Sequence, residues 1–114
     1  MPLISLYTNV KLDNAQEMLT ARQLSTLAST QLGKPEQWAM VKVDAGQSMC
    51  FAGSDVPCAY LECKSIGLTD AQIPPLAAAL SSLLQRQLHI DPARIYIEFA
   101  SAKPQHWGWN GDTF

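Results

Sequence analysis

Basic stripes, long apolar runs and paired cysteines are all missing from this chain of 114 residues. Eight Lys and Arg residues are scattered among ten Asp and Glu residues, and the formal net charge is −2. We therefore expect neither nucleic acid nor an anionic membrane surface as a partner. No apolar run approaches the roughly 20 residues that span a bilayer. The start, Met-Pro-Leu-Ile-Ser, has no basic region or cleavage pattern, so we expect a cytoplasmic protein and leave leaderless secretion open.

Cysteine and histidine are too few to indicate a disulfide framework or a metal site. Cys50, Cys58 and Cys63 are an odd number, which argues against the paired thiols of a small secreted domain. Cys58 and Cys63 lie five residues apart in a predicted strand, where an odd separation points side chains to opposite faces. We therefore expect free, buried thiols. The spacing of His89 and His106 indicates no metal, and we expect no organic cofactor.

What the chain does contain is one β-α-β pattern that occurs twice. Its length fits a single α+β domain over residues 1–114. Four segments are β-prone, namely residues 3–7, 38–43, 58–64 and 94–99. The pattern divides the chain into two pseudo-repeats at about residues 2–45 and 58–101.

A constant offset relates the two halves. Pro35 matches Pro92 and Leu3 matches Tyr60, and both pairs are 57 positions apart, which is half of the chain. Parallel pairing of the two strands in each unit needs a crossover helix, and each unit supplies one. We therefore predict a four-stranded mixed sheet with two helices on one face.

Capping signals mark the ends of both predicted helices. Asn14 with Glu17 three residues later is a capping box, and Thr69 with Gln72 is a second one. Gly33 is placed to end the first helix in the left-handed conformation. The apolar stripes recur at three- and four-residue steps, at Met18, Ala21, Leu24, Ala28 and Leu32 and at Ile73, Leu76, Leu80, Leu84 and Leu88.

With both helices on one face, the other face of the sheet is left without cover. Ile4 and Leu6 alternate with Tyr7 in a strand that is apolar on both sides, and the chain offers no third helix. Apolar sheet faces are covered in folded proteins. We therefore expect sister subunits to cover this face in a barrel-like core. Residues 47–52 and 105–110 are expected to be short edge strands that link the subunits.

Pro2 has chemistry that depends on processing. Methionine is normally removed before a small residue such as proline, which leaves a secondary amine at the terminus. An ordinary α-amino group has a pKa near ~8, so only about a tenth is neutral at pH 7. Burial beside a cation lowers this pKa and makes the amine a competent base. The strand that follows at once predicts a terminus that is anchored to the sheet.

Several short motifs stand in a fixed order along the whole chain. They are Met1-Pro2 before a strand, Thr8-Asn9-Val10, Gly33-Lys34-Pro35, Gly53-Ser54 with Pro57-Cys58-Ala59, Ser65-Ile66-Gly67, Arg94-Ile95-Tyr96-Ile97, and Gly108-Trp109-Asn110 with Thr113-Phe114. Together they resemble the family of macrophage migration inhibitory factor and D-dopachrome tautomerase, in the tautomerase superfamily. The resemblance implies the doubled β-α-β fold, a homotrimer, and a site at each subunit interface around the terminal proline.

The resemblance also implies roles for individual residues. Pro2 is the catalytic acid/base, Lys34 binds the substrate carboxylate and lowers the pKa of the proline, and the backbone N–H of Ile66 holds the same carboxylate. Tyr96 enters the site from the neighbouring subunit. The aromatic positions at the pocket rim are Trp38, Trp109 and Phe114. Taken alone, Lys34 would be interpreted as a cation at a helix C-terminus, and the aromatic residues as core or interface.

The implied reaction is keto–enol tautomerisation of aryl pyruvates, such as phenylpyruvate and p-hydroxyphenylpyruvate. Pro2 takes the enol hydroxyl proton and returns a proton to the adjacent carbon, without metal or cofactor. Glu98 departs from the family, because many relatives carry asparagine there. An ionised glutamate accepts a hydrogen bond from a phenol but repels a second carboxylate. We therefore expect activity on aryl pyruvates, favouring p-hydroxyphenylpyruvate, and poor activity on diacids.

Two alternatives stay open. One is a cytokine-like protein-interaction module with a vestigial active site, although Leu12 stands where the family's receptor-binding arginine falls. The other is a dehalogenase or decarboxylase, which needs paired arginines or an activated water near the proline. Arg22, Arg86 and Arg94 form no such pair in the predicted elements. Cys58 also lacks the second cysteine of a C-x-x-C motif, so thiol oxidoreductase activity is not expected.

Overall fold

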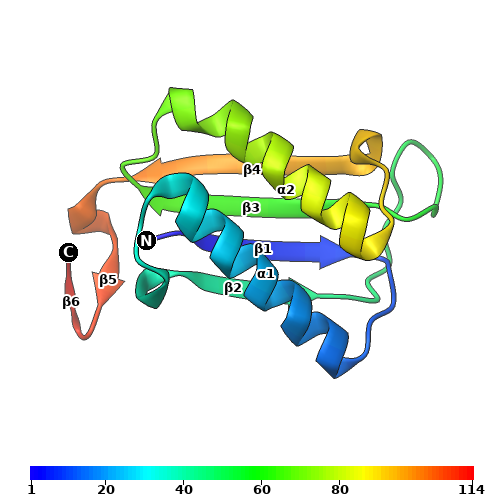
Figure 1. Ribbon diagram of the computed structural model, residues 1–114, viewed down its shortest axis with the longest axis horizontal. Helices are drawn as coiled ribbons and strands as arrows, with labels where there is room; N and C mark the ends of the chain where they lie inside the picture. The colour runs from blue at the N-terminus through cyan, green and yellow to red at the C-terminus, as the bar shows by residue number, and fades with distance from the viewer.

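Two β-α-β units share one sheet in the computed structural model, which describes residues 1–114 (Figure 1). The main elements are β1 (Leu3–Thr8), α1 (Asn14–Leu32), β2 (Met40–Asp44), β3 (Ala59–Ile66), α2 (Ile73–Leu88), β4 (Ile95–Ala102), β5 (Gly108–Trp109) and β6 (Asp112–Thr113). β1 pairs in parallel with β2, and β3 with β4, while β1 and β3 pair antiparallel, so the strand order is β2-β1-β3-β4. Both helices cover the same face of this mixed sheet (Figure 1). The predicted fold is confirmed.

The strand boundaries differ slightly from the prediction. β2 begins at Met40 and not at residue 38, because Glu36–Trp38 forms a 3-10 turn. β4 continues to Ala102, three residues beyond its predicted end, because its parallel pairing with β3 continues to the Ile66–Ala102 pair. The residues in this stretch are small or polar, so the hydrophobic pattern did not indicate that the strand continues.

The first helix begins with a capping box that lies one residue earlier than predicted. Asp13 is the N-cap, its carboxylate accepts from the Gln16 N–H at 2.8 Å, and the Gln16 side chain accepts from the Asp13 N–H at 3.0 Å. The predicted box of Asn14 and Glu17 is therefore wrong. Gly33 ends the helix at φ 62°, as predicted, in a conformation that glycine adopts at little cost.

The capping box predicted before the second helix is present. The Gln72 side chain accepts from the Thr69 N–H at 3.0 Å in a capping box. This box caps a short 3-10 turn, Asp70–Gln72, which leads directly into α2. Pro74 and Pro75 lie in the first turn of α2, where a missing N–H leaves no helical hydrogen bond unmade.

The core lies between the sheet and the helices. Ile4, Leu6 and Leu61 of the sheet are buried, and so are the predicted stripe residues Leu24, Ala28 and Leu32 of α1 and Leu76, Leu80, Leu84 and Leu88 of α2. Ile73 packs against this core while partly buried, but Met18 is 52% exposed and does not join it, contrary to the predicted stripe. The core therefore extends over less of α1 than the periodicity indicated.

The three cysteines are free thiols, as expected, but only two of them are buried. Burial raises the pKa of the Cys63 thiol to about 11, so this residue stays protonated at neutral pH. Cys50 is exposed, in a loop between β2 and β3, and the expectation that it is buried is wrong.

The sheet face that points away from the helices mixes aromatic and charged side chains. Tyr7 and Tyr60 stack there with ring centroids 6.0 Å apart, and Lys42 pairs with Asp44 at 2.6 Å. Glu98 lies on the same face and is exposed, so the expectation that both faces of the strands are apolar is wrong. The charged residues at alternate positions of the other strands include Lys42, Glu62, Lys64 and Glu98.

The predicted linking strands differ from the structure. Residues 47–52 form no strand, and the loop contains only an isolated bridge between Phe51 and Ser54. At the C-terminus, a 3-10 turn at Pro104–His106 precedes β5, which pairs with β6 in a small separate hairpin. No helix is both long and apolar enough to cross a membrane.

Replacing Asp13 with alanine tests the observed cap. Asp13→Ala should lower the free energy of unfolding by about 1 kcal/mol, because it leaves an N–H at the start of α1 without its acceptor. Asn14→Ala is the matched control and should change it by less than about 0.5 kcal/mol. Urea denaturation at one protein concentration measures both, and a larger loss for Asn14→Ala would contradict the assignment.

Candidate functional site

The start of β1 and the C-terminal hairpin enclose a cleft of about 390 Å³. Figure 1 shows the N-terminus next to β5 at one end of the sheet. Met1 and Pro2 line the cleft from the strand side, Trp38 lines it from the 3-10 turn before β2, and Trp109 and Phe114 line it from the C-terminal segment. The cleft thus joins the first and last residues of the chain.

Pro2 is held firmly at the base of this cleft. It is fully buried, and its carbonyl accepts from the Met40 N–H at 2.9 Å, which ties the beginning of the chain to β2. Proline suits the first position before a strand, where a donor is least needed. The sequence prediction of an anchored terminus is confirmed.

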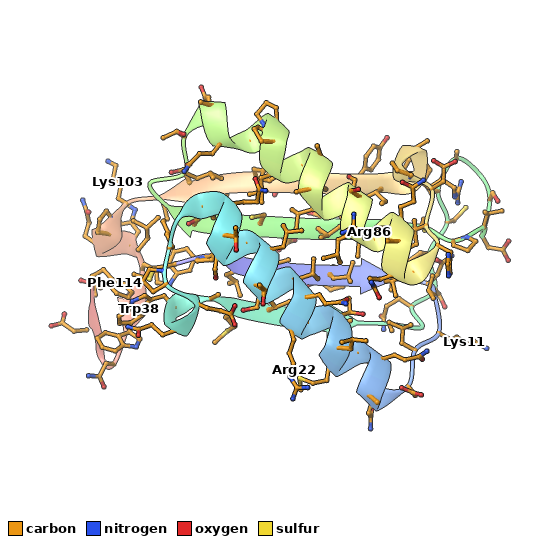
Figure 2. The ribbon with its side chains drawn as sticks, viewed as in Figure 1. Lys11, Arg22, Trp38, Arg86, Lys103 and Phe114 are labelled. Carbon is orange, nitrogen blue, oxygen red and sulfur yellow. The ribbon has the colours of Figure 1, made fainter.

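Three aromatic rings form one wall of the cleft. Trp38 lies edge-on to Trp109 at 4.8 Å and to Phe114 at 5.5 Å, and Trp109 stacks on Phe114 at 5.7 Å. Figure 2 shows Trp38 and Phe114 side by side at this end of the molecule. The Phe114 N–H donates to the Trp107 carbonyl at 3.1 Å, which holds the last residue in place. An aryl group would find edge and face contacts on this wall.

Lys34 connects the end of α1 to the end of β3. It follows the cap residue Gly33, and its ammonium donates to the Ser65 hydroxyl at 2.9 Å and to the Ile66 carbonyl. Ser65 is fully buried, and sequence reasoning gave it no role. The sequence feature that points to Ser65 is its place in the Ser65-Ile66-Gly67 motif, in which only Ile66 was predicted to have a role.

The electrostatics at the terminus favour a neutral amine. Burial lowers the pKa of the Met1 α-amino group to about 6, with further lowering from the charge of Lys34 and from its hydrogen bond. An amine with that pKa is about nine-tenths neutral at pH 7, whereas an ordinary terminus is about nine-tenths protonated. The site therefore disfavours a second positive charge beside Lys34.

Tyr96 and Glu98 lie away from this cleft. Leu3, next to Pro2, is opposite Lys64 on β3, whereas Tyr96 is opposite Tyr60, near the other end of the sheet. Five residues along β4 separate Tyr96 from the level of Pro2, a distance of about 16 Å at ~3.3 Å per residue. Tyr96 is 67% exposed. Within one subunit the cleft thus brings Pro2 together with Trp38, Trp109 and Phe114. Lys34, bonded to Ile66, acts on the terminal amine without itself lining the cleft. Tyr96 and Glu98 are not among the lining residues.

A larger hollow of about 520 Å³ lies between α1 and α2. Arg22 and Arg86 line it, on the helical layer (Figure 2). Pro2 is not among its lining residues, so these arginines do not form the pair that a dehalogenase or decarboxylase needs near the proline. Nowhere do three or more His, Cys, Asp or Glu side chains come together in a group that could hold a metal ion.

A doubled β-α-β sheet whose chain terminus lies in an aromatic cleft beside a lysine is a tautomerase-type architecture. The family model of macrophage migration inhibitory factor (MIF) matches residues 1–114. The chain is 38% identical to macrophage migration inhibitory factor of Meriones unguiculatus and 35% identical to a homolog from Brugia malayi, and both alignments cover 100% of this chain and 99% of the relative. The crystal structure of a homologue from Prochlorococcus marinus superposes with a TM-score of 0.92 at 33% identity and covers 98% of each chain. The chain belongs to the macrophage migration inhibitory factor family.

A titration of the terminus tests the role of Lys34. In a sample that retains Met1, the α-amino group should titrate near pH 6, and Lys34→Met should raise this pKa because it removes the neighbouring cation. Lys11→Met is the control, because Lys11 is exposed and lies at the opposite end of the molecule (Figure 2). NMR detection of ¹³C-labelled Met1 reports the pKa directly. An equal value in the native chain and Lys34→Met would contradict the assignment.

Proposed function

We propose that this protein is a keto–enol tautomerase of aryl pyruvates, with Pro2 as the general acid/base, and that it works as a homotrimer. The observation that carries the proposal is the combination at one point of a fully buried Pro2, a depressed amine pKa and the Lys34 ammonium. Membership of a family in the tautomerase superfamily supports the same class of reaction.

Removal of Met1 places the basic nitrogen on Pro2. Pro2 is more deeply buried than Met1 and lies in the same cleft, so the burial that lowers the pKa of the amine is retained. The proline amine is then mainly neutral at pH 7 and ready to accept a proton. As the pH falls through the depressed pKa, the amine becomes protonated and the rate should fall with it.

The carboxylate of the substrate pairs with Lys34 in this proposal. A lysine ammonium has three N–H donors, and Ser65 and Ile66 accept two of them. The third donor, which serves the Met1 amine while Met1 is present, becomes available for a ligand once Met1 is removed. The backbone N–H of Ile66 is proposed as a second donor. The aryl ring lies against Trp38, Trp109 and Phe114, where its burial is favourable.

One proton transfer cycle completes the reaction. The neutral Pro2 nitrogen takes the proton from the enol hydroxyl and leaves an enolate. The electrons of the C–C double bond then take a proton from the prolinium as the oxygen's electrons form the carbonyl, which makes the new C–H bond and restores the neutral amine. The carbon and oxygen positions are close together, so a single group serves both.

Tyr96 and Glu98 are assigned to the site of a neighbouring subunit. Neither residue lines the cleft of its own subunit, and both are exposed. In a trimer, the exposed end of β4 would reach the cleft of the next subunit. Glu98 would there face the far end of the substrate and accept a hydrogen bond from a phenolic hydroxyl. This arrangement favours p-hydroxyphenylpyruvate over diacids.

A ketonisation assay on phenylenolpyruvate tests the catalyst. Pro2→Gly and Lys34→Ala should each lower kcat/KM by at least about 100-fold, because the first changes the acid/base and the second removes the carboxylate partner. Lys11→Ala should leave kcat/KM unchanged. Each sample must be shown by intact mass to lack Met1. Absence of activity in the native chain without Met1 would contradict the proposal.

Mixing two variants that are each impaired in a different half of the site tests whether the site is shared. Subunits with Pro2→Gly keep an intact Tyr96, and subunits with Tyr96→Ala keep an intact Pro2. Random reassembly of the two variants should therefore restore both residues in about a quarter of the sites. Sedimentation should give three times the 12.5 kDa of one chain. A monomeric mass at micromolar concentration, or mixtures no more active than their components, would exclude a site shared between subunits.

A further inference from the structure

The loop between β2 and β3 is held by a single arginine. Arg94 stands at the end of a 3-10 turn, just before β4. Its Nη1 donates to the Phe51 carbonyl at 3.1 Å, its Nη2 to those of Ser54 at 3.1 Å and Val56 at 2.9 Å, and its Nε to that of Pro57 at 3.1 Å. One guanidinium therefore binds four backbone carbonyls of the same loop, which fixes the path of the loop.

The bound loop contains a tight turn with an unfavourable backbone conformation. Phe51 and Ser54 exchange N–H···O bonds of 2.9 and 3.0 Å, and Ala52 and Gly53 between them have φ of 53° and 73°. Two central residues with positive φ are typical of a type I′ turn, which favours glycine or asparagine at both positions. Alanine is disfavoured in this conformation, so the turn needs support from outside itself. Arg94 supplies that support at both ends of the turn.

The turn places Phe51 between Arg94 and Tyr96. The guanidinium carbon lies 5.2 Å from the centre of the Phe51 ring, and the Phe51 and Tyr96 rings are 4.7 Å apart at 54°. Arg94, from the 3-10 turn, and Tyr96, from β4, therefore both lie against the Phe51 ring. Tyr96 is 67% exposed, and Phe51 is the aromatic ring packed against it.

We propose that Arg94 is a positioning residue for the reaction: by holding the Phe51 turn, it fixes the ring of Tyr96 in the orientation that the neighbouring subunit's site requires. The inference rests on the proposed function, in which Tyr96 acts across the subunit interface. Arg94 contacts neither Pro2 nor the cleft of its own subunit, which lies at the opposite end of the sheet. Its effect on the reaction passes through Phe51 and Tyr96 alone.

Asn9 holds the same loop through bonds that do not involve Arg94. Its Nδ2 donates to the Asp55 carbonyl at 2.9 Å, and its Oδ1 accepts from the Cys58 N–H at 2.9 Å. The Thr8 hydroxyl also donates to the Cys58 carbonyl at 2.7 Å. An Arg94 variant should therefore still fold with the loop attached, while the turn around Phe51 becomes less ordered. Phe51→Leu is a second variant, which removes the ring contact and leaves the bonds of Arg94 to the loop carbonyls in place.

The first measurement needs no activity. In protein with ¹³C-labelled tyrosine rings, the Tyr96 signals should move toward their random-coil positions in Phe51→Leu, because the ring current of Phe51 is lost. They should move in the same direction in Arg94→Met. Arg86→Met, whose guanidinium bonds only to Ser82 on its own helix, is the matched control and should leave them unchanged. Unmoved Tyr96 signals in Arg94→Met would overturn the proposal whether or not the protein is a tautomerase.

The second measurement is a double-mutant cycle in the ketonisation assay. Arg94→Met and Phe51→Leu should each lower kcat/KM by about tenfold in the native background, mainly through KM, because they misplace a binding group. In the Tyr96→Ala background, the same substitutions should lower it by less than about twofold, because the group they position is gone. The pH dependence of kcat/KM, set by Pro2, should not change. A full tenfold loss in the Tyr96→Ala background would overturn the proposal and assign Arg94 a purely structural role.

Discussion

The contact between Lys34 and the end of β3 is the constraint on which the site depends. The ammonium ties the residue after α1 to Ser65 and Ile66, and it stands beside the chain terminus. Two cations this close in a partly buried cleft repel one another, and the repulsion is removed when the amine gives up its proton. The charge of Lys34 therefore adds to burial, which is the larger cause of the lowered pKa of the Met1 amine, and both favour the neutral form of the terminus.

Most of the fold could be predicted because it depends on local patterns. The stripe of leucines in α2 and the position of Gly33 each identify their element within a few residues of sequence. The cap of α1 was misplaced because Asp13 with Gln16 and Asn14 with Glu17 satisfy the same rule, and only the backbone geometry distinguishes them.

The loop between the repeats could not be predicted in the same way. Its form depends on Arg94, which is 43 residues away from Phe51 in the chain. A pattern in residues 47–52 carries no information about such a partner, so the expectation of a strand there was wrong. The candidate site shows the same limit. The aromatic residues at the C-terminus and Pro2 at the start were linked through a family resemblance, whereas the role of Ser65 emerged only when its bond to Lys34 was seen.

The duplication gives the sheet two related ends, and the two ends have different tasks. An offset of 57 relates the loop between β2 and β3 to the C-terminal segment after β4, so the Phe51 turn and the β5–β6 hairpin occupy equivalent places. The hairpin lines the cleft at the chain terminus, and the turn packs on Tyr96 at the opposite end. A chain has only one N-terminal amine, so only one end can hold the proposed base. The other end presents an ordered aromatic residue, and in the proposed function a closed ring of subunits would bring the two kinds of end together.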